Sequence, residues 1–376
     1  MDSAPLLSVV MTVYNGEAYL EEAIESILSQ TFPEFEFIII NDGSLDRTQD
    51  IIQRYADGDP RIRFENREHI GRVEALNTCC RLANGKYVAI MDADDVALPD
   101  RFERQLDFLE VHPAVSLLGG GVQKISGEGR RFSTVMFPTE DLEIKKELMR
   151  VGCLAHSTVV MRRDAFEDVG GYRGAFPPAE DYDLWLRMAE RHQLGNLPAV
   201  LVKYRVHSNQ VSFTQLEAHV LTTLGAQLAA RVRKERGIDP TAGVRQITRE
   251  FLADFGIGKE MIDRTILNNF LALSVTLSMS GAQGASMRNL ERCLEWAKAV
   301  GWSGGDLARI HAAFASGYFK QGRFLRCLTA VMNVFRGDPF AALALICRGA
   351  DRLFRVTSSR KLESRNQIDS VSSSTG

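Results

Sequence analysis

The sequence lacks several features that would restrict its class. Its 376 residues contain no run of 18 or more apolar residues, so we expect no transmembrane helix. No basic segment precedes the first apolar run, so we expect no signal peptide. None of the six cysteines has C-x-x-C spacing, which argues against a zinc site and favours free, mostly buried thiols. Neither charge dominates, since 45 Lys and Arg accompany 48 Asp and Glu, and no nucleic-acid partner is expected.

The pattern of apolar residues predicts two regions of different architecture. Up to about residue 212, short strands alternate with helices of roughly ten to fifteen residues, which is typical of βαβ units and a parallel sheet. The expected strands are 6–14, 35–40, 61–65, 87–91, 115–125, 157–161 and 199–206. From residue 213 only helical periodicity follows. We therefore expect an α/β domain over 1–212, a helical domain over 213–356 and a disordered Ser-rich tail over 357–376.

The stretch KYVAIMDADD, residues 86–95, joins a buried strand to three carboxylates. Asp92, Asp94 and Asp95 repel one another unless a cation or several donors compensate their charge. Ligands of open α/β sheets bind outside the carboxyl ends of the strands, and Mg²⁺ or Mn²⁺ favours oxygen ligands, including substrate phosphates. The stretch predicts a divalent cation that holds a phosphorylated substrate. The alternative is an Asp-rich turn that only begins the next helix.

Two further acidic sites lie at predicted element ends. Asp42 follows the strand 35–40, and parallel strands end at one edge of a sheet, so Asp42 should lie near the DADD turn. One pocket would then have Asp42 accepting from a base, Asp92 near a ribose and Asp94 at the metal. Glu180 and Asp181 begin the helix predicted over 180–192. A capping carboxylate favoured by the helix dipole is the alternative for Asp181.

Four segments carry a resemblance to a known family. TVYNGEAYLEEAIESILSQTF, IINDGS with Asp46, GRVEALNTCCRLANGKYVAIMDADD and AEDYDLWLRM occur in the order found in inverting family 2 glycosyltransferases. The chain resembles that family over residues 6–212 and not beyond. The resemblance implies a GT-A fold, a Rossmann-like, mostly parallel sheet flanked by helices, followed here by an all-α C-terminal region.

The resemblance also implies roles for individual residues. The nucleotide would be bound by Thr12, Tyr14, Asn15, Glu17 and Asp42. The diphosphate-sugar site would be lined by Gly71, Arg72 and Asn77. Asp92 would serve the ribose, Asp94 the metal-bound diphosphate and Asp181 the catalytic proton transfer. His207 matches a further metal or diphosphate ligand of some relatives. His156 and Glu180 are acceptor-side candidates, with a satisfied structural histidine as the alternative for His156.

The implied activity moves a sugar from a nucleotide diphosphate sugar, with UDP favoured over dTDP or GDP, to an acceptor hydroxyl with inversion. Mn²⁺ or Mg²⁺ would neutralise the leaving diphosphate, and the acceptor would be a glycan or a lipid-linked molecule. The expected setting is bacterial cell-surface polysaccharide, lipopolysaccharide or glycoconjugate assembly, in the cytoplasm or at the inner membrane face. One alternative is a nucleotidyltransferase, but the loop NGEAYLEE is acidic where a triphosphate would need basic residues. Another is a non-catalytic nucleotide-sugar-binding interaction protein.

The C-terminal helices are basic and amphipathic. Residues 320–365 contain ten Lys and Arg against three Asp and Glu, interleaved with large apolar residues. This pattern is typical of peripheral binding to an anionic membrane. The alternatives are a packing domain whose basic face is solvated, or a homo-oligomer contact. Residues 312–331 resemble one tetratricopeptide-type helix-turn-helix, without a second copy.

Overall fold

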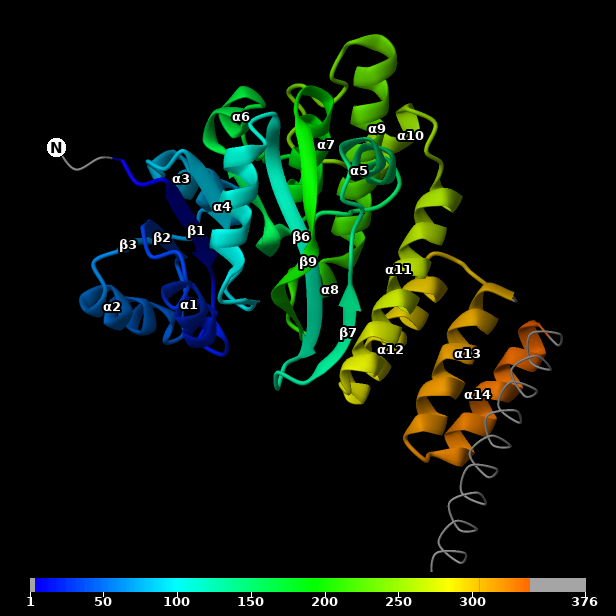
Figure 1. Cartoon of the computed structure of the whole chain (residues 1–376). Helices are drawn as coiled ribbons and strands as arrows, with labels where there is room; N and C mark the ends of the chain where they lie inside the picture. The colour runs from blue at the N-terminus through cyan, green and yellow to red at the C-terminus, as the bar shows by residue number, and fades with distance from the viewer. Residues whose placement is uncertain (1–3, 304, 339–376) are drawn as a thin grey trace, which may run out of the picture. The chain divides into compact units, whose positions relative to one another are not determined.

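The computed structural model describes residues 4–303 and 305–338, which form two compact units (Figure 1). The first unit ends at Ile266 and the second begins at Leu267, inside helix α11, Lys259–Ser280. The sheet ends close to the boundary predicted at residue 212, but two later helices belong to the first unit. The predicted helix 339–355 and the predicted tail lie outside the described residues. No helix among the described residues is both long and apolar enough to cross a membrane.

The first unit alternates strands and helices for most of its length. Its strands are β1 Leu7–Val13, β2 Phe35–Asp42, β3 Ile62–Arg67, β4 Tyr87–Ile90, β5 Val96–Ala97, β6 Val115–Ser126, β7 Arg131–Val135, β8 Val160–Arg162 and β9 Gln193–Val206. Its helices are α1 Leu20–Leu28, α2 Thr48–Gly58, α3 Arg72–Leu82, α4 Arg101–Val111, α5 Asp141–Leu148, α6 Arg163–Asp168, α7 Glu180–Arg191, α8 Val211–Thr214, α9 Leu216–Arg236 and α10 Arg249–Asp254.

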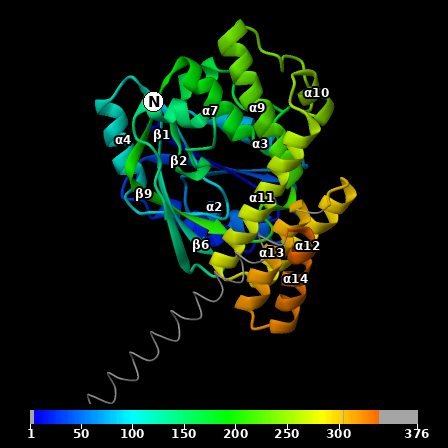
Figure 2. The ribbon, with the colours of Figure 1, turned by 90° about the vertical axis from the view of Figure 1, so that its right-hand side faces the viewer.

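These strands form one mixed sheet in the order β3-β2-β1-β4-β8-β6-β9-β5, and β7 pairs with β6. The first four strands of this order are parallel. β8 is antiparallel to both β4 and β6, whereas the long strands β6 and β9 run parallel to each other (Figure 2). Most paired residues are therefore in parallel ladders. The predicted α/β class, a mostly parallel sheet flanked by helices and followed by a helical C-terminal region, is confirmed.

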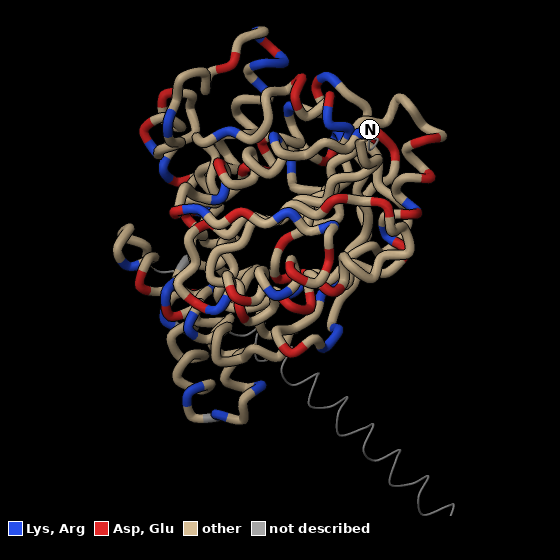
Figure 3. The backbone as a smooth tube through the Cα atoms, turned by 90° about the vertical axis from the view of Figure 1, so that its left-hand side faces the viewer, with Lys and Arg blue, Asp and Glu red and all other residues tan. Residues whose placement is uncertain are grey.

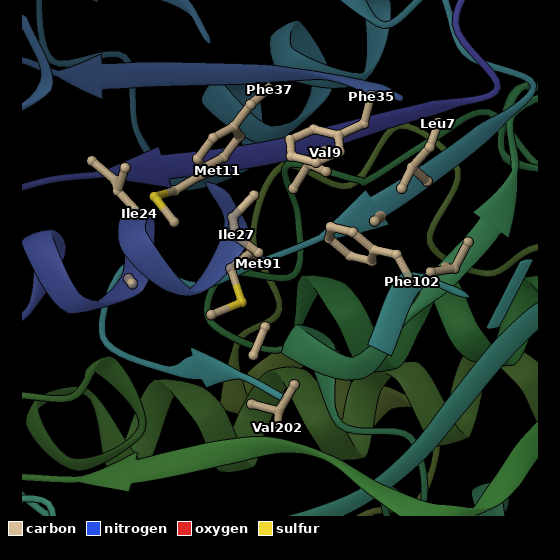
Figure 4. Close-up of a cluster of buried hydrophobic side chains, with 14 of the residues drawn as sticks. Leu7, Val9, Met11, Ile24, Ile27, Phe35, Phe37, Met91, Phe102 and Val202 are labelled. Carbon is tan, nitrogen blue, oxygen red and sulfur yellow. The ribbon is translucent and has the colours of Figure 1, made fainter. Parts of the chain in front are cut away.

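The core lies against the parallel half of the sheet. Alternate residues of a strand point to the same face, and Val9 and Met11 of β1 lie opposite Phe37 and Ile39 of β2. These side chains are fully buried with the apolar face of α1 and with Phe102 of α4 (Figure 4). The intervening residues of β1 and β2 are buried as well, and α3 packs against both strands. Burial on both faces explains why these strands appear in the sequence as continuous apolar runs.

Two sequence expectations need correction, and some elements were not predicted. The strand predicted over 157–161 is a 3₁₀ turn over His156–Thr158 followed by the short strand β8. The last strand begins at Gln193 and not near residue 199, and α5 and β7 were not predicted. The thiols behave as expected in the described residues, where Cys79, Cys80, Cys153 and Cys293 are free and buried.

The second unit is helical, as predicted. It contains the end of α11, then α12 Gln283–Ala299, α13 Gly305–Lys320 and α14 Phe324–Gly337. α13 packs against α12 and against α14, so α13 and α14 form the helix-turn-helix expected over 312–331 (Figure 1).

Candidate active site

The predicted acidic residues meet at one edge of the sheet. β1 lies between β2 and β4, and all three strands are parallel, so their carboxyl ends share this edge. Asp42 is the last residue of β2, and the DADD turn follows β4. The expected proximity of Asp42 and the DADD turn is therefore confirmed by the topology.

Asp42 holds the loop that leads into α3. Its Oδ1 accepts from the Ile70 backbone N–H at 2.7 Å, and its Oδ2 accepts from the Gly71 N–H at 3.1 Å. Gly71 has a positive φ of 87°, which glycine adopts without steric cost, and it directly precedes Arg72. His69 Nδ1 also lies 3.0 Å from Asp42 Oδ2, and Asp42 is 3% exposed, so a contact of Asp42 with a base stays a prediction. Asp42 thus fixes the position from which Arg72 extends.

Arg72 joins the DADD turn to the start of α7. Its Nε donates to Glu180 Oε1 at 2.6 Å, and its Nη2 donates to Asp92 Oδ1 at 2.8 Å. A planar guanidinium presents its donors in a fixed fork, so one arginine can hold two carboxylates at a set separation. Glu180 is 3% exposed, and its Oε2 has no hydrogen-bond partner among the described residues. The acidic motif of β4 and the Glu180–Asp181 pair, about ninety residues apart, therefore belong to one site.

His156 and Ser157 complete the surroundings of Asp92. The Nδ1 of His156 lies 3.0 Å from Asp92 Oδ1, its Nε2 lies 3.0 Å from the Tyr172 hydroxyl, and Ser157 Oγ donates to Asp92 Oδ2 at 2.9 Å. Burial acts to raise the pKa of the Asp92 carboxyl, but the charges of His156 and Arg72 outweigh it and hold the pKa well below its usual value. Asp92 is therefore a fixed anion in this network.

Asp181 has a different environment from Asp92. Its Oδ1 accepts from the Tyr182 N–H at 2.7 Å, as a residue in the first turn of a helix can do. Burial raises the pKa of Asp181 and the Glu180 charge adds to this rise, although His156 and His219 act to lower it. The net result is a pKa above the usual value. A half-buried carboxylate with a raised pKa is a stronger base than an exposed one, which suits it to accept a proton.

Asp94 and His207 converge at the other end of the turn. His207 Nε2 lies 2.9 Å from Asp94 Oδ2, and its ring packs on Tyr19 with the ring centroids 4.9 Å apart. No set of three His, Cys, Asp or Glu side chains that could hold a metal occurs within the described ranges. Mg²⁺ commonly takes one or two protein ligands and completes its shell with substrate phosphates and water. Asp94 could supply a carboxylate to a metal bound in that way, and a role of His207 as a further ligand stays a prediction.

Asp95 holds the turn and does not face a ligand. Its Oδ1 accepts from the Arg205 backbone N–H at 2.8 Å, and its Oδ2 lies 2.5 Å from Ser157 Oγ, whose single proton is shared between Asp95 and Asp92. Arg205 also donates from Nε to the Asp94 carbonyl at 2.8 Å, and it ion-pairs with Glu22. These contacts fasten the DADD turn to the end of β9, next to His207.

The first loop of the chain is tied to the turn after β2. The Asn15 N–H donates to Ser44 Oγ at 2.8 Å, and Glu17 Oε2 accepts from Arg47 Nε at 3.2 Å. Tyr14 is 49% exposed, and its ring contacts that of His69 in a tilted arrangement with the ring centroids 4.5 Å apart. The remaining predicted nucleotide-binding residue of this region is Thr12, which is buried on β1.

Asn77 has a clear structural contact. Its Nδ2 donates to the Tyr172 carbonyl, and its Oδ1 accepts from the Tyr172 N–H, both at 2.9 Å. Asn77 therefore holds the turn that places the Tyr172 hydroxyl on His156. A role of Asn77 toward the diphosphate sugar stays a prediction.

Several residues of the site were not found by sequence reasoning. Ser157, Tyr172, Arg205 and His219 all contribute to it. Arg205 could have been suspected, because an arginine in a buried strand needs partners. His219 lies on α9, beyond the region that resembles the family, and nothing in its local sequence distinguishes it from a helix-surface residue.

The comparisons with known proteins identify the family of this chain. The family model described as glycosyl transferase family 2 matches residues 8–170. An uncharacterized glycosyltransferase of Haemophilus influenzae is 32% identical over 222 residues, which are 56% of this chain and 69% of that protein. The O-antigen biosynthesis glycosyltransferase WbnJ of Escherichia coli is 32% identical over 216 residues, which are 56% of this chain and 84% of that protein. Among solved structures, TarS of S. aureus has a TM-score of 0.49 at 18% identity, covering 75% of this chain and 53% of that chain. The chain belongs to glycosyltransferase family 2.

Proposed function

We propose that this glycosyltransferase transfers a sugar from a nucleotide diphosphate sugar to an acceptor hydroxyl with inversion, and that Asp181 is the general base. The observation that carries the proposal is the Arg72 bridge, which joins Asp92 at the DADD turn to Glu180, the neighbour of Asp181. A donor diphosphate at the DADD turn would then place its sugar toward the start of α7.

The proposed reaction uses these positions. The acceptor oxygen forms a bond to the anomeric carbon while the bond from that carbon to the diphosphate oxygen breaks. The acceptor proton passes to the Asp181 carboxylate, and the nucleoside diphosphate leaves from the opposite face, which inverts the anomeric configuration. General-base catalysis of this kind contributes about 10²–10⁴-fold. A divalent cation on Asp94 and His207 would neutralise charge on the leaving diphosphate.

The proposed donor is a UDP sugar, and the proposed acceptor is a growing glycan or a lipid-linked intermediate of cell-surface polysaccharide synthesis. The E. coli relative is named for O-antigen biosynthesis, which supports this class of acceptor. The proposed place of action is the cytoplasm, at the inner face of the membrane.

A thermal-shift screen tests the donor site. UDP, dTDP and GDP are each added with Mn²⁺ or with a chelator. A ligand at a hundred times its Kd stabilises the protein by about 2.7 kcal/mol, and we expect such a shift with UDP and Mn²⁺. Asp94→Asn should lose the metal-dependent part of the shift, whereas the exposed α4 variant Asp107→Asn should keep it. If no nucleotide raises Tm with Mn²⁺, the proposal is wrong.

A further inference from the structure

The second unit contains an open hollow formed by α12, the end of α13 and the start of α14. It has a volume of about 610 Å³, within the range of roughly 300–1,000 Å³ that small-molecule sites occupy. The lining residues that the argument uses are Arg288, Glu291, Tyr318, Lys320, Arg323 and Arg326. All of them lie within the second unit, so the hollow is separate from the candidate active site.

The hollow gathers positive charge. Four of its side chains are cationic and only Glu291 is anionic. None of the guanidinium groups of Arg288, Arg323 and Arg326 has an ion-pair partner in the part of the chain that the structure describes. Lys320 donates to Ser278 Oγ at 2.9 Å and likewise has no recorded carboxylate partner there. Basic positions are visible at the turn between α13 and α14 (Figure 3).

The turn that joins α13 to α14 fixes these charges in place. Gly322 has a positive φ of 69°, and the Arg323 N–H donates back to the Tyr318 carbonyl at 2.9 Å, which closes the end of α13. Arg326 follows in the first turn of α14, and Arg288 faces the same hollow from α12. The positive side chains around the hollow repel one another, because the turn and the helices hold them near each other. An anion bound between these side chains would therefore be stabilising.

We propose that this hollow binds a phosphate group. Guanidinium groups bind phosphate oxygens through paired, charge-assisted hydrogen bonds, and the Tyr318 hydroxyl and the Lys320 ammonium add further donors. The phosphate belongs either to a phospholipid headgroup or to a soluble phosphorylated molecule. This site goes beyond sugar transfer and does not depend on the proposed donor or on Asp181.

The test measures binding of inorganic pyrophosphate to the full chain by calorimetry, with a chelator present so that no metal supports binding at the DADD turn. Arg323→Gln/Arg326→Gln removes two charges from the hollow. Lys298→Gln/Arg336→Gln removes two charges elsewhere in the same unit and is the matched control. Circular dichroism and Tm confirm that both variants are folded.

We expect the hollow variant to raise the Kd for pyrophosphate by about tenfold or more and the control to leave it nearly unchanged. Equal losses in both variants, or no binding by the unmodified chain, would overturn the proposal. Co-sedimentation with phosphatidylglycerol vesicles identifies the source of the phosphate. Binding to vesicles that the hollow variant loses and the control keeps assigns the headgroup. If the chain binds pyrophosphate through the hollow but does not bind the vesicles, the phosphate belongs to a soluble molecule.

Discussion

Replacing Arg72 by methionine should destabilise the first unit through its two carboxylate partners. Methionine keeps much of the side-chain length of arginine and removes its charge. Glu180 would then be a buried carboxylate without a partner on either oxygen, because Oε2 already has no partner among the described residues. Asp92 would keep His156 and Ser157. The main cost therefore comes from Glu180.

The magnitude follows from the exposure of the three side chains. Breaking a buried ion pair by removing one partner costs about 3–5 kcal/mol. Glu180 and Asp92 are 4% and 19% exposed, but Arg72 is 34% exposed, so water screens part of its charge. We therefore expect a loss of about 2–3 kcal/mol. In a unit of this size, that loss lowers Tm by roughly 4–10 °C.

Calorimetric unfolding of a double-mutant cycle tests this reasoning. Glu180→Gln removes the charge that Arg72→Met leaves without a partner, so Arg72→Met/Glu180→Gln should be more stable than Arg72→Met alone by about 1–2 kcal/mol. Arg72→Lys should recover little, because an ammonium cannot reproduce the fork that reaches both carboxylates. The reasoning would be refuted by a Tm for Arg72→Met within about 1 °C of that of the unmodified protein. It would also be refuted if the double variant were no more stable than Arg72→Met.

Three further predictions concern other parts of the first unit. His219 lowers the pKa of Asp181 when it is protonated, although burial lowers the pKa of His219 itself, so in His219→Asn the acid limb of kcat/KM should move slightly to higher pH. Burial acts to raise the pKa of Asp239, but hydrogen bonds from Thr241 and the charges of Arg173 and Arg233 outweigh it and lower the pKa from 3.8 to about 2. Its contribution, on the order of 2 kcal/mol, should be present above about pH 4 and lost as the pH falls toward 2, and Asp239→Asn should flatten Tm over this interval. Gly85→Ala should cost about 1–3 kcal/mol in chemical denaturation, because its Cβ would lie 2.6 Å from the Ser8 nitrogen.

Most of the parallel half of the fold could be predicted because β1, β2 and β4 each carry a continuous apolar run. Burial on both faces leaves that signature in a single sequence. The carboxyl ends of those strands then determined where Asp42 and the DADD turn would meet. The expected proximity of these acidic residues required no knowledge of side-chain contacts.

The contacts within the site could not be predicted in the same way. Residues 157–159 look like the start of a strand, but tertiary contacts override that local preference. His156 and Ser157 reach Asp92 and Asp95 from a 3₁₀ turn. Arg205 bonds the backbone and side chains of segments more than a hundred residues away. Such long-range hydrogen bonds leave no periodic pattern in the sequence.

Turnover of Asp181→Asn tests the central claim most directly. Asparagine keeps the shape of the side chain and cannot accept the acceptor proton. We predict that kcat falls by about 10²–10⁴-fold while the Kd for the nucleotide with Mn²⁺ stays within about twofold. Asp107→Asn serves as the control and should keep both values. Full turnover by Asp181→Asn would contradict the account.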